Sequence, residues 1–452
     1  MASEALDVWL YETLIGNLTE PKRGTLRLDY VEEAETRFRP GSSVLSVSMP
    51  LDVSRRPNGA VVRAFFHGLL PEASVRARLE EEFSVAPGDD FALLSAIGRD
   101  CAGAVVLQPT GSPPPKNAGS FAVVTDEWLE DAIRHIDDRP LGADTEVRVS
   151  LPGAQEKLLV ARTREGKWAR AVDGAPTTHI LKPQDLRLRG YAAAEAFCLE
   201  LARSLRLTDV AVEVTTIADR PVLIVSRYDR VMTDDGVERL HQEDATQALA
   251  VDLSGGRARL KCEAYGGKSL RDFAEILRSF ASASDVDNLL RLTVLNVAVG
   301  NADAHAKNLS LLHPRDGSVH LAPAYDITPT AFYRGVPTAD GLKDLTDQLG
   351  MRVNGRRSVH EVTSEDLVAE ACSWGISRRR VQEVVRQTLM AIDAATDSAA
   401  QLAGVPGEIV AFVSERLTAL QAAEAAGARE HTTSYSFGNG GGASNTAAEG
   451  LD

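Results

Sequence analysis

The chain has 452 residues, of which 44% are hydrophobic and 25% charged, and its formal net charge is −15. This length accommodates two or three domains of ordinary globular composition. It contains no apolar run near the ~20 residues that span a bilayer, and its acidic start, MASEALDVWLYETL, lacks the pattern of a secretion signal. The negative charge argues against a surface built for phosphate contacts. We therefore expect a cytoplasmic protein without membrane binding.

The first 108 residues are predicted to form a small α+β subdomain. Short alternating runs such as GTLRLDYV and SVLSVSMPL indicate hairpin strands. The stretch AVVRAFFHGLLPEASVRARLEEEF indicates a helix over 60–83. A second helix is expected in DDFALLSAIGRDC, where Asp89 or Asp90 is the expected N-cap.

Residues 109–146 are predicted to be a linker with one short helix, because QPTGSPPPKNAGS is rich in Pro, Gly and Ser. Residues 147–235 return to strand patterns around one helix, GYAAAEAFCLELARSL. Residues 236–428 are predicted to be helical throughout, and the Gly-rich and Ser-rich tail, 429–452, to be disordered. A strand-rich lobe followed by an all-helical lobe predicts a protein-kinase-like α+β fold with an added N-terminal subdomain. The four cysteines are too far apart to predict a metal site or a disulfide framework.

The segment VGNADAHAKNLSLL places polar residues between two apolar runs. A surface turn would use the same residue types. However, Asp303 and Asn308 have the spacing of a kinase catalytic loop, D-x-x-x-x-N. Asp303 is then the predicted base, and Asn308 together with Asp326, in LAPAYDITPT, are the predicted Mg²⁺ ligands.

Two further residues, which lie earlier in the chain, complete this kinase pattern. Lys182 ends the predicted strand THILKP, and Glu195 follows 13 residues later within the predicted helix. A kinase uses such a lysine to touch the ATP phosphates and such a glutamate to fix it. The predicted phosphate loop, SLPGAQEKL, departs from this pattern because it has one glycine where a protein kinase has three.

The chain resembles the HipA-type serine/threonine kinases, the toxins of bacterial toxin–antitoxin pairs. The resemblance extends from about residue 5 to 420. It rests on the stretches FFHGLLPEASVR, SLPGAQEKL, THILKP, VSRYDR, LHQEDATQAL, YGG, NADAHAKNLSLL and APAYDITPT. It implies ATP and Mg²⁺ as cofactors and a protein substrate linked to translation, such as an aminoacyl-tRNA synthetase. It also implies a HipB-like helix-turn-helix antitoxin as partner, through which DNA is contacted indirectly.

The resemblance also implies roles for individual residues. Ser226 to Tyr228 would receive the adenine, Asp229 would lie near the ribose, and Ser150 would be an autophosphorylated serine. The nucleotide-binding residues implied in this way are Pro152, Gly153, Ala154, Gln155, Glu156, Lys157, Lys182, Ser226, Arg227, Tyr228, Asp229, His305, Ala306, Lys307, Asn308, Tyr325 and Asp326.

Two other interpretations are consistent with the sequence. One is a pseudokinase, a catalytically silent binding module that acts through an antitoxin–operator complex. The other is a small-molecule kinase on a related fold. Turnover of ATP separates the first from an active kinase, and the appearance of labelled phosphate on protein separates the second.

Overall fold

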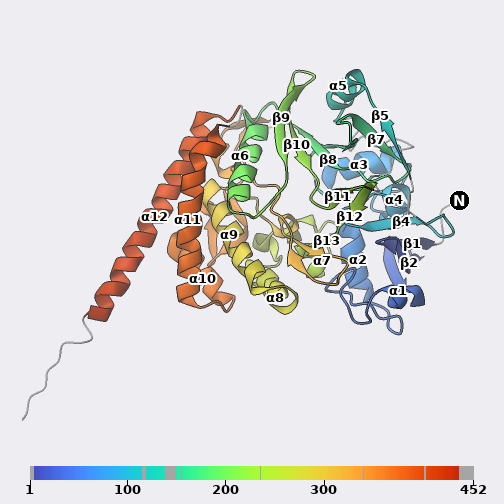
Figure 1. The fold of residues 1–452 in the computed structure, drawn as a ribbon, viewed down its shortest axis with the longest axis horizontal. Helices are drawn as coiled ribbons and strands as arrows, with labels where there is room; N and C mark the ends of the chain where they lie inside the picture. The colour runs from blue at the N-terminus through green and yellow to red at the C-terminus, as the bar shows by residue number, and fades with distance from the viewer. Residues whose placement is uncertain are drawn as a thin grey trace, which may run out of the picture.

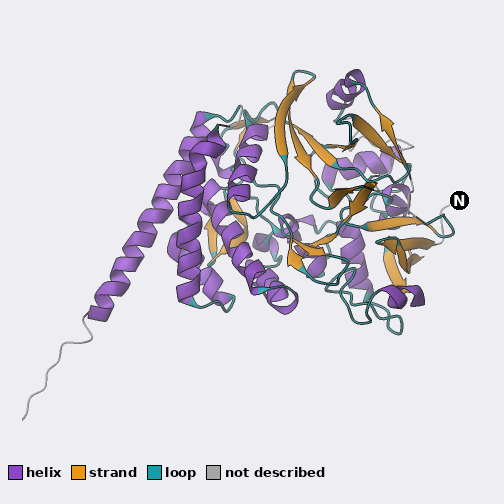
Figure 2. Ribbon diagram, in the orientation of Figure 1, coloured by secondary structure: helices purple, strands orange, loops and turns teal. Residues whose placement is uncertain are grey.

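The computed structural model describes residues 5–114, 119–137, 149–153, 155–234, 236–338, 341–401 and 404–436. Figure 1 shows an N-terminal subdomain at one end, helices α9 to α12 at the other, and strands β8 to β10 between and above them. Figure 2 shows the same segregation by type, with the long helices gathered on one side and most strands on the other.

The N-terminal subdomain is an antiparallel sheet of order β3-β2-β1-β4 packed against short helices. Its elements are β1 (Ala5–Leu10), β2 (Thr13–Lys22), β3 (Thr25–Tyr30), α1 (Glu32–Arg37), α2 (Gly59–Gly68), α3 (Ala73–Glu82), α4 (Asp90–Ile97) and β4 (Val105–Pro109). Asp89 caps α4 as predicted, since its side chain accepts a hydrogen bond from the Ala92 amide. The single helix predicted over 60–83 is wrong: α2 and α3 are separated at 69–72, where Pro71 disfavours helical backbone in the residue before it.

The strand-rich lobe contains a six-stranded sheet of order β5-β7-β6-β8-β10-β9. Its elements are β5 (Ser120–Val123), α5 (Asp126–Arg134), β6 (Leu158–Arg162), β7 (Trp168–Val172), β8 (His179–Pro183), α6 (Tyr191–Ser204), β9 (Val212–Ile217) and β10 (Arg220–Ser226), followed by the ribbon β11 (Arg230–Thr233) and β12 (Gly236–Arg239). Strand β5 lies within the predicted linker and pairs with β7, so this part of the linker belongs to the lobe.

The second lobe is mainly helical but carries short strands, so the prediction of an all-helical lobe is wrong. Its helices are α7 (Ala245–Ala248), α8 (Leu270–Phe280), α9 (Ala283–Val299), α10 (Ser364–Ser373), α11 (Arg378–Ala400) and α12 (Gly407–Ser436), with 3-10 turns η1 (Ala258–Lys261), η2 (Glu263–Tyr265), η3 (Ala306–Asn308), η4 (Thr330–Phe332) and η5 (Val359–Glu361). Its strands are β13 (His241–Asp244), β14 (Ser310–His313), β15 (His320–Leu321), β16 (Val336–Thr338), β17 (Gly341–Lys343), β18 (Gln348–Val353) and β19 (Arg356–Ser358).

Helix α12 corrects the predicted tail as well. It runs to Ser436, so residues 429–436, predicted to be disordered, are helical. The rest of that predicted tail, 437–452, lies outside the described residues. Within the described part of the chain, no helix is both long enough and apolar enough to cross a bilayer.

The largest hydrophobic core joins α6 to helices α8 to α11 and supports the segment that follows α9. Helix α9 begins at a capping box formed by Ser282 and Asp285 and ends at Gly300, whose φ of 76° is left-handed. A Cβ at Gly300 would lie 2.8 Å from the Phe412 ring, so glycine also fits the space. The polar segment 301–308 therefore leaves a buried helix at a fixed point and direction.

Candidate active site

A cavity of about 400 Å³ lies where the three parts of the chain meet. Strand β8, the end of β10, the segment after α9 and the segment before η4 all border it. The N-terminal subdomain also reaches it, through Glu72 and Ala102. The predicted site residues, which run from Pro152 to Asp326 in the sequence, are thus largely brought to one place.

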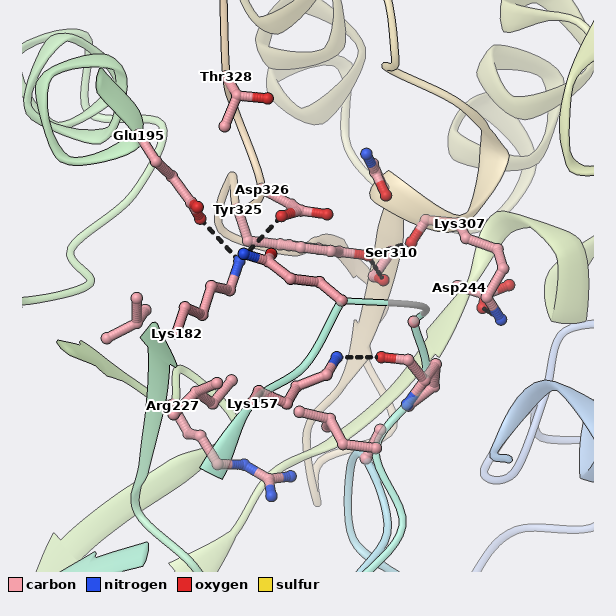
Figure 3. A pocket seen from close by; sticks show the side chains of 18 of the residues that line it. Lys157, Lys182, Glu195, Arg227, Asp244, Lys307, Ser310, Tyr325, Asp326 and Thr328 are labelled. Atoms are coloured by element: carbon pink, nitrogen blue, oxygen red, sulfur yellow. Dashed lines mark hydrogen bonds and ion pairs between the residues drawn. The ribbon is translucent and has the colours of Figure 1, made fainter. Parts of the chain in front are cut away.

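Lys182 lies at the centre of a buried ion network in this cavity. Its ammonium is 2.7 Å from Glu195 Oε1 on α6 and 2.9 Å from Asp326 Oδ1 (Figure 3). Burial opposes the charge on the lysine, but Asp326 and Glu195 outweigh it and raise the pKa of Lys182 above its ordinary value. In return, Lys182 lowers the pKa of Asp326 to about 2. The predicted lysine–glutamate pair is confirmed as a contact.

Asp326 has a left-handed backbone conformation, which is uncommon outside glycine although Asp adopts it more readily than most residues. Its φ is 57°, in the left-handed region, where a residue other than glycine is strained by about 1–3 kcal/mol. Its side chain nevertheless remains 45% exposed towards the cavity. Strain of this kind persists where the surrounding structure holds a residue for a purpose, and here it directs a carboxylate at the space above Lys182.

The catalytic-loop candidates surround the same cavity. The Asp303 side chain is exposed to it, and the Asn308 amide donates to the Asp303 carbonyl at 3.3 Å. Desolvation by the cavity wall raises the pKa of Asp303, against an opposing effect of His305. Burial lowers the pKa of His305, so its ring is neutral at neutral pH, and its Nδ1 is buried without a hydrogen-bond partner among the described residues.

Two other members of this loop serve internal contacts. The Lys307 ammonium is 2.9 Å from Asp244 Oδ2 and donates to the Gly68 carbonyl at 3.3 Å, although the residue also borders the cavity. Ala306 is buried in the main core. Its methyl group packs inward, so the nucleotide contact predicted for Ala306 stays a prediction for its backbone alone.

The predicted phosphate loop lies opposite the catalytic loop. Lys157 donates to the Pro152 carbonyl at 2.6 Å, and burial, aided by Lys182, lowers the pKa of Lys157 to about 8. Gly153 has a φ of 118°, and a Cβ there would lie 2.8 Å from the Lys157 ammonium. Gln155 borders the cavity, whereas Ala154 lies outside the described residues.

Glu156 does not belong to the cavity. Its carboxylate pairs with Arg78 on α3, in the N-terminal subdomain. The carboxylate is engaged in this contact between the loop and the subdomain, so the nucleotide contact predicted for Glu156 stays a prediction for its backbone alone.

The predicted adenine-binding segment follows β10. The amides of Ser226 and Arg227 donate to the carbonyls of Ala211 and Thr178, at 3.0 and 2.9 Å. The Tyr228 ring stacks on Tyr325, with ring centroids 5.6 Å apart. Ser226, Arg227 and Tyr228 all border the cavity. The two tyrosines provide flat apolar surface beside it.

The charged groups of Arg227 and Asp229 point elsewhere. The Asp229 carboxylate receives Arg227 at 2.8 Å, Arg230 at 3.0 Å and the Gly103 amide at 2.7 Å. Figure 3 shows Arg227 extending away from Lys182 and Asp326. Asp229 is buried, and its oxygens are already occupied by these donors. Asp229 borders the cavity, but its charged oxygens face these donors, so its place near the ribose stays a prediction, and Arg227 has only its backbone to offer.

Ser150 is held in place by the N-terminal subdomain. It is fully buried, its hydroxyl donates to the Leu69 carbonyl at 2.7 Å, and its amide donates to the Asp100 carbonyl at 2.9 Å. Both partners belong to the N-terminal subdomain. Any modification of this hydroxyl requires that the segment first leave the subdomain.

Sequence reasoning missed several cavity residues, among them the charged pair Glu72 and Lys261. Their side chains are 3.0 Å apart and both border the cavity. Glu72 ends the motif LLPE in the segment between α2 and α3, where Pro71 signalled a break in the helical pattern. Lys261 ends η1, and the residues around it carried no kinase pattern.

Residues 6–108 match the family model of the HipA N-terminal domain, and residues 149–396 match that of the HipA-like C-terminal domain. The second match alone covers more than half of the chain. The chain belongs to the HipA family. Its fold agrees with a solved HipA structure from Shewanella oneidensis, in complex with HipB and operator DNA, with a TM-score of 0.75 at 23% identity over 93% of this chain and 96% of that one.

Curated relatives place this HipA-family chain among kinases. The putative kinase Y4mE of Sinorhizobium fredii is 35% identical over 406 residues, which are 87% of this chain and 92% of the relative. The serine/threonine-protein kinase toxin HipA of Shewanella oneidensis is 26% identical over 387 residues, 82% of this chain and 84% of the relative. The protein is therefore a protein kinase with a kinase-like fold.

Proposed function

We propose that this protein transfers the γ-phosphoryl group of ATP to serine or threonine hydroxyls of a protein substrate, as a toxin of the HipA type. The observation that carries the proposal is the Lys182–Glu195–Asp326 network, which lies in one cavity with Asp303 and Asn308. Lys182 would neutralise phosphate charge, with Glu195 fixing its position. Lys157 and the loop of residues 152–157 would cover the phosphates, and Tyr228 and Tyr325 would flank the adenine.

The donors present fit a magnesium ion. Asp326 offers an exposed carboxylate and Asn308 an amide, and hard Mg²⁺ prefers a few such oxygens together with phosphates. The buried His305 Nδ1 without a partner also indicates a polar occupant beside it. Asp326 and Asn308 would hold the ion, which when bound neutralises charge on the phosphates.

Asp303 would act on the acceptor. Its carboxylate is open to the cavity, and its raised pKa suits a group that takes a proton. It would orient the attacking hydroxyl and accept its proton as the new phosphorus–oxygen bond forms. The bond from the γ-phosphorus to its bridging oxygen breaks, and ADP leaves with that electron pair.

Asp303→Ala should reduce phosphoryl transfer by about 10²–10⁴-fold and leave the fold intact. Transfer from γ-labelled ATP to protein measures this, with Asp397→Ala, on the exposed face of α11, as the control. Near-normal transfer by the Asp303 variant at saturating ATP would remove the base assignment. A wild-type chain without ATP turnover would favour the pseudokinase, and label only on small molecules would favour the small-molecule kinase.

The partner proposal is a HipB-like DNA-binding antitoxin, with DNA contacted through it and a cytoplasmic location for the complex. It is supported by family membership and by the related HipA, whose solved structure contains HipB and operator DNA. The proposed substrate is a protein linked to translation, such as an aminoacyl-tRNA synthetase, which follows from the family resemblance.

We also propose that Ser150 is autophosphorylated and that this switches the enzyme off. A phosphoserine carries about −1.5 to −2 charges, which cannot occupy the buried site where the hydroxyl now meets the Leu69 carbonyl. The modified segment would leave the N-terminal subdomain and take the phosphate loop with it. Mass spectrometry after incubation with ATP should find phosphate on Ser150, with ATP affinity falling in proportion. Full modification with unchanged affinity would contradict the switch, and Ser150→Ala is the unmodifiable control.

A further inference from the structure

Four lysines border the cavity, and three of them have evident tasks. Lys157 is fixed to the Pro152 carbonyl, Lys182 lies between Glu195 and Asp326, and Lys307 is paired with Asp244. The fourth, Lys261, has no role in the kinase pattern that the sequence revealed.

Lys261 is held by the N-terminal subdomain. Its side chain is 24% exposed, and its ammonium donates to Glu72 Oε2 at 3.0 Å. The Glu72 amide in turn donates to the Gly153 carbonyl at 3.2 Å, so the same residue contacts the phosphate loop. Glu72 thus joins a cavity lysine, the phosphate loop and the subdomain.

The lysines that border the cavity act on different acidic residues in it. Lys157 and Lys182 lie beside Asp326, which feels the charge of both. Lys261 instead acts electrostatically on Asp303 and His305. One pair of lysines therefore serves the side of the predicted metal ligands, and Lys261 serves the side of the predicted base.

The catalytic loop itself brings no free cation to that side. His305, two residues after Asp303, is buried and its pKa is lowered, and the Lys307 ammonium lies 2.9 Å from Asp244 and 3.9 Å from Glu72. During transfer, negative charge spreads over the oxygens of the phosphoryl group while it lies between ADP and the acceptor. A cation placed there stabilises the transition state more than the bound ATP, which accelerates the chemical step.

We propose that Lys261 is a further catalytic residue, which contacts a non-bridging oxygen of the phosphoryl group during transfer, and that Glu72 is its positioning residue. The inference rests on the proposed kinase activity. The hydroxyl proton goes to Asp303, the P–O bond to ADP breaks, and Lys261 gains or loses no proton. The N-terminal subdomain then completes the active site, so its docking is a condition for catalysis.

The test compares Lys261→Met and Lys261→Arg in single-turnover transfer at saturating Mg²⁺-ATP, with ATP affinity measured separately. Lys261→Met should slow the chemical step by about 10²–10³-fold and leave ATP affinity nearly unchanged. Lys261→Arg should restore most of the rate, because it keeps the charge. Arg63→Met is the matched control, since Arg63 on α2 forms another ion pair between the subdomain and the second lobe, 2.8 Å from Asp252. It should leave the rate unchanged.

Glu72→Gln tests the positioning role. In the otherwise wild-type protein, this substitution should slow phosphoryl transfer without changing the midpoint of thermal unfolding. In the Lys261→Met variant, it should not slow transfer further. Equal additional slowing in both backgrounds would overturn the positioning role.

The kinase activity and the role of Lys261 would be contradicted by different results. A wild-type chain without transfer would overturn the kinase proposal and the inference with it. If the wild type transfers phosphate normally, two results would overturn the role of Lys261 alone. The Lys261→Met variant could transfer phosphate as fast as the wild type, or it could lose ATP affinity without slowing the chemical step.

Discussion

Two ion networks lie beside the same cavity and differ in exposure. In the first, Lys182 joins Glu195 and Asp326, and the Asp326 side chain is 45% exposed. In the second, Asp100 and Asp229 receive Arg227 and Arg230, and all four side chains are at most 4% exposed. Both contain motif residues that the family resemblance assigned to the nucleotide, but only the first network has an oxygen open to a ligand.

The second network has a structural consequence. Its arginines also donate to the carbonyls of Cys101 and Gly103, so the charges are satisfied within the protein. Asp100 and these carbonyls belong to the N-terminal subdomain, whereas Arg227 and Arg230 flank the segment after β10. The network therefore fastens the subdomain to the predicted adenine site, and breaking it should affect stability before chemistry.

Asp100→Asn should have the largest effect on stability. It removes a fully buried carboxylate and leaves Asp229 as the one counter-charge for Arg227 and Arg230 in this network, and breaking a buried ion pair typically costs about 3–5 kcal/mol. Urea unfolding should show this decrease in the free energy of unfolding, with Asp397→Asn as the surface control. An unchanged unfolding midpoint accompanied by lost ATP binding would instead place this network in the nucleotide site.

Lys157 in the cavity should make ATP binding depend on pH, and this effect should be smaller than the loss of stability in Asp100→Asn. With the pKa of Lys157 at about 8, the ammonium that would face the phosphates loses its proton as pH rises through that value. ATP binding should weaken by up to about tenfold between pH 7 and pH 9. Lys157→Arg, which stays charged, should show a flat profile. The same decline in the arginine variant would exclude Lys157 as its source.

The sequence predicted Lys182, Glu195 and Asp303 as cavity residues because each of them stands in a local pattern. Lys182 ends a strand, Glu195 follows on a helix, and Asp303 follows the end of a buried helix. The roles of Asp229 and Glu156 could not be predicted in this way, because their partners lie far away in the chain and burial is set by tertiary packing.

The contribution of the N-terminal subdomain was hidden for a related reason. Glu72 lies beyond a proline inside a stretch that looked like one helix, and its contact with Lys261 joins residues 189 positions apart. Both residues lie in or near family motifs, FFHGLLPEASVR and YGG, but neither motif assigns them a chemical role. Only the docking of the subdomain brings them to the cavity.

The most direct measurement of the central claim is ATP titration, with and without Mg²⁺, of Asp326→Asn and Asp229→Asn, alongside their thermal midpoints. The account predicts that Asp326→Asn stays folded and loses mainly the Mg²⁺-dependent part of ATP binding. It predicts that Asp229→Asn is destabilised and that its folded fraction binds Mg²⁺-ATP normally. A stable Asp229→Asn with lost ATP binding, beside an Asp326→Asn with normal Mg²⁺-ATP binding, would contradict the account.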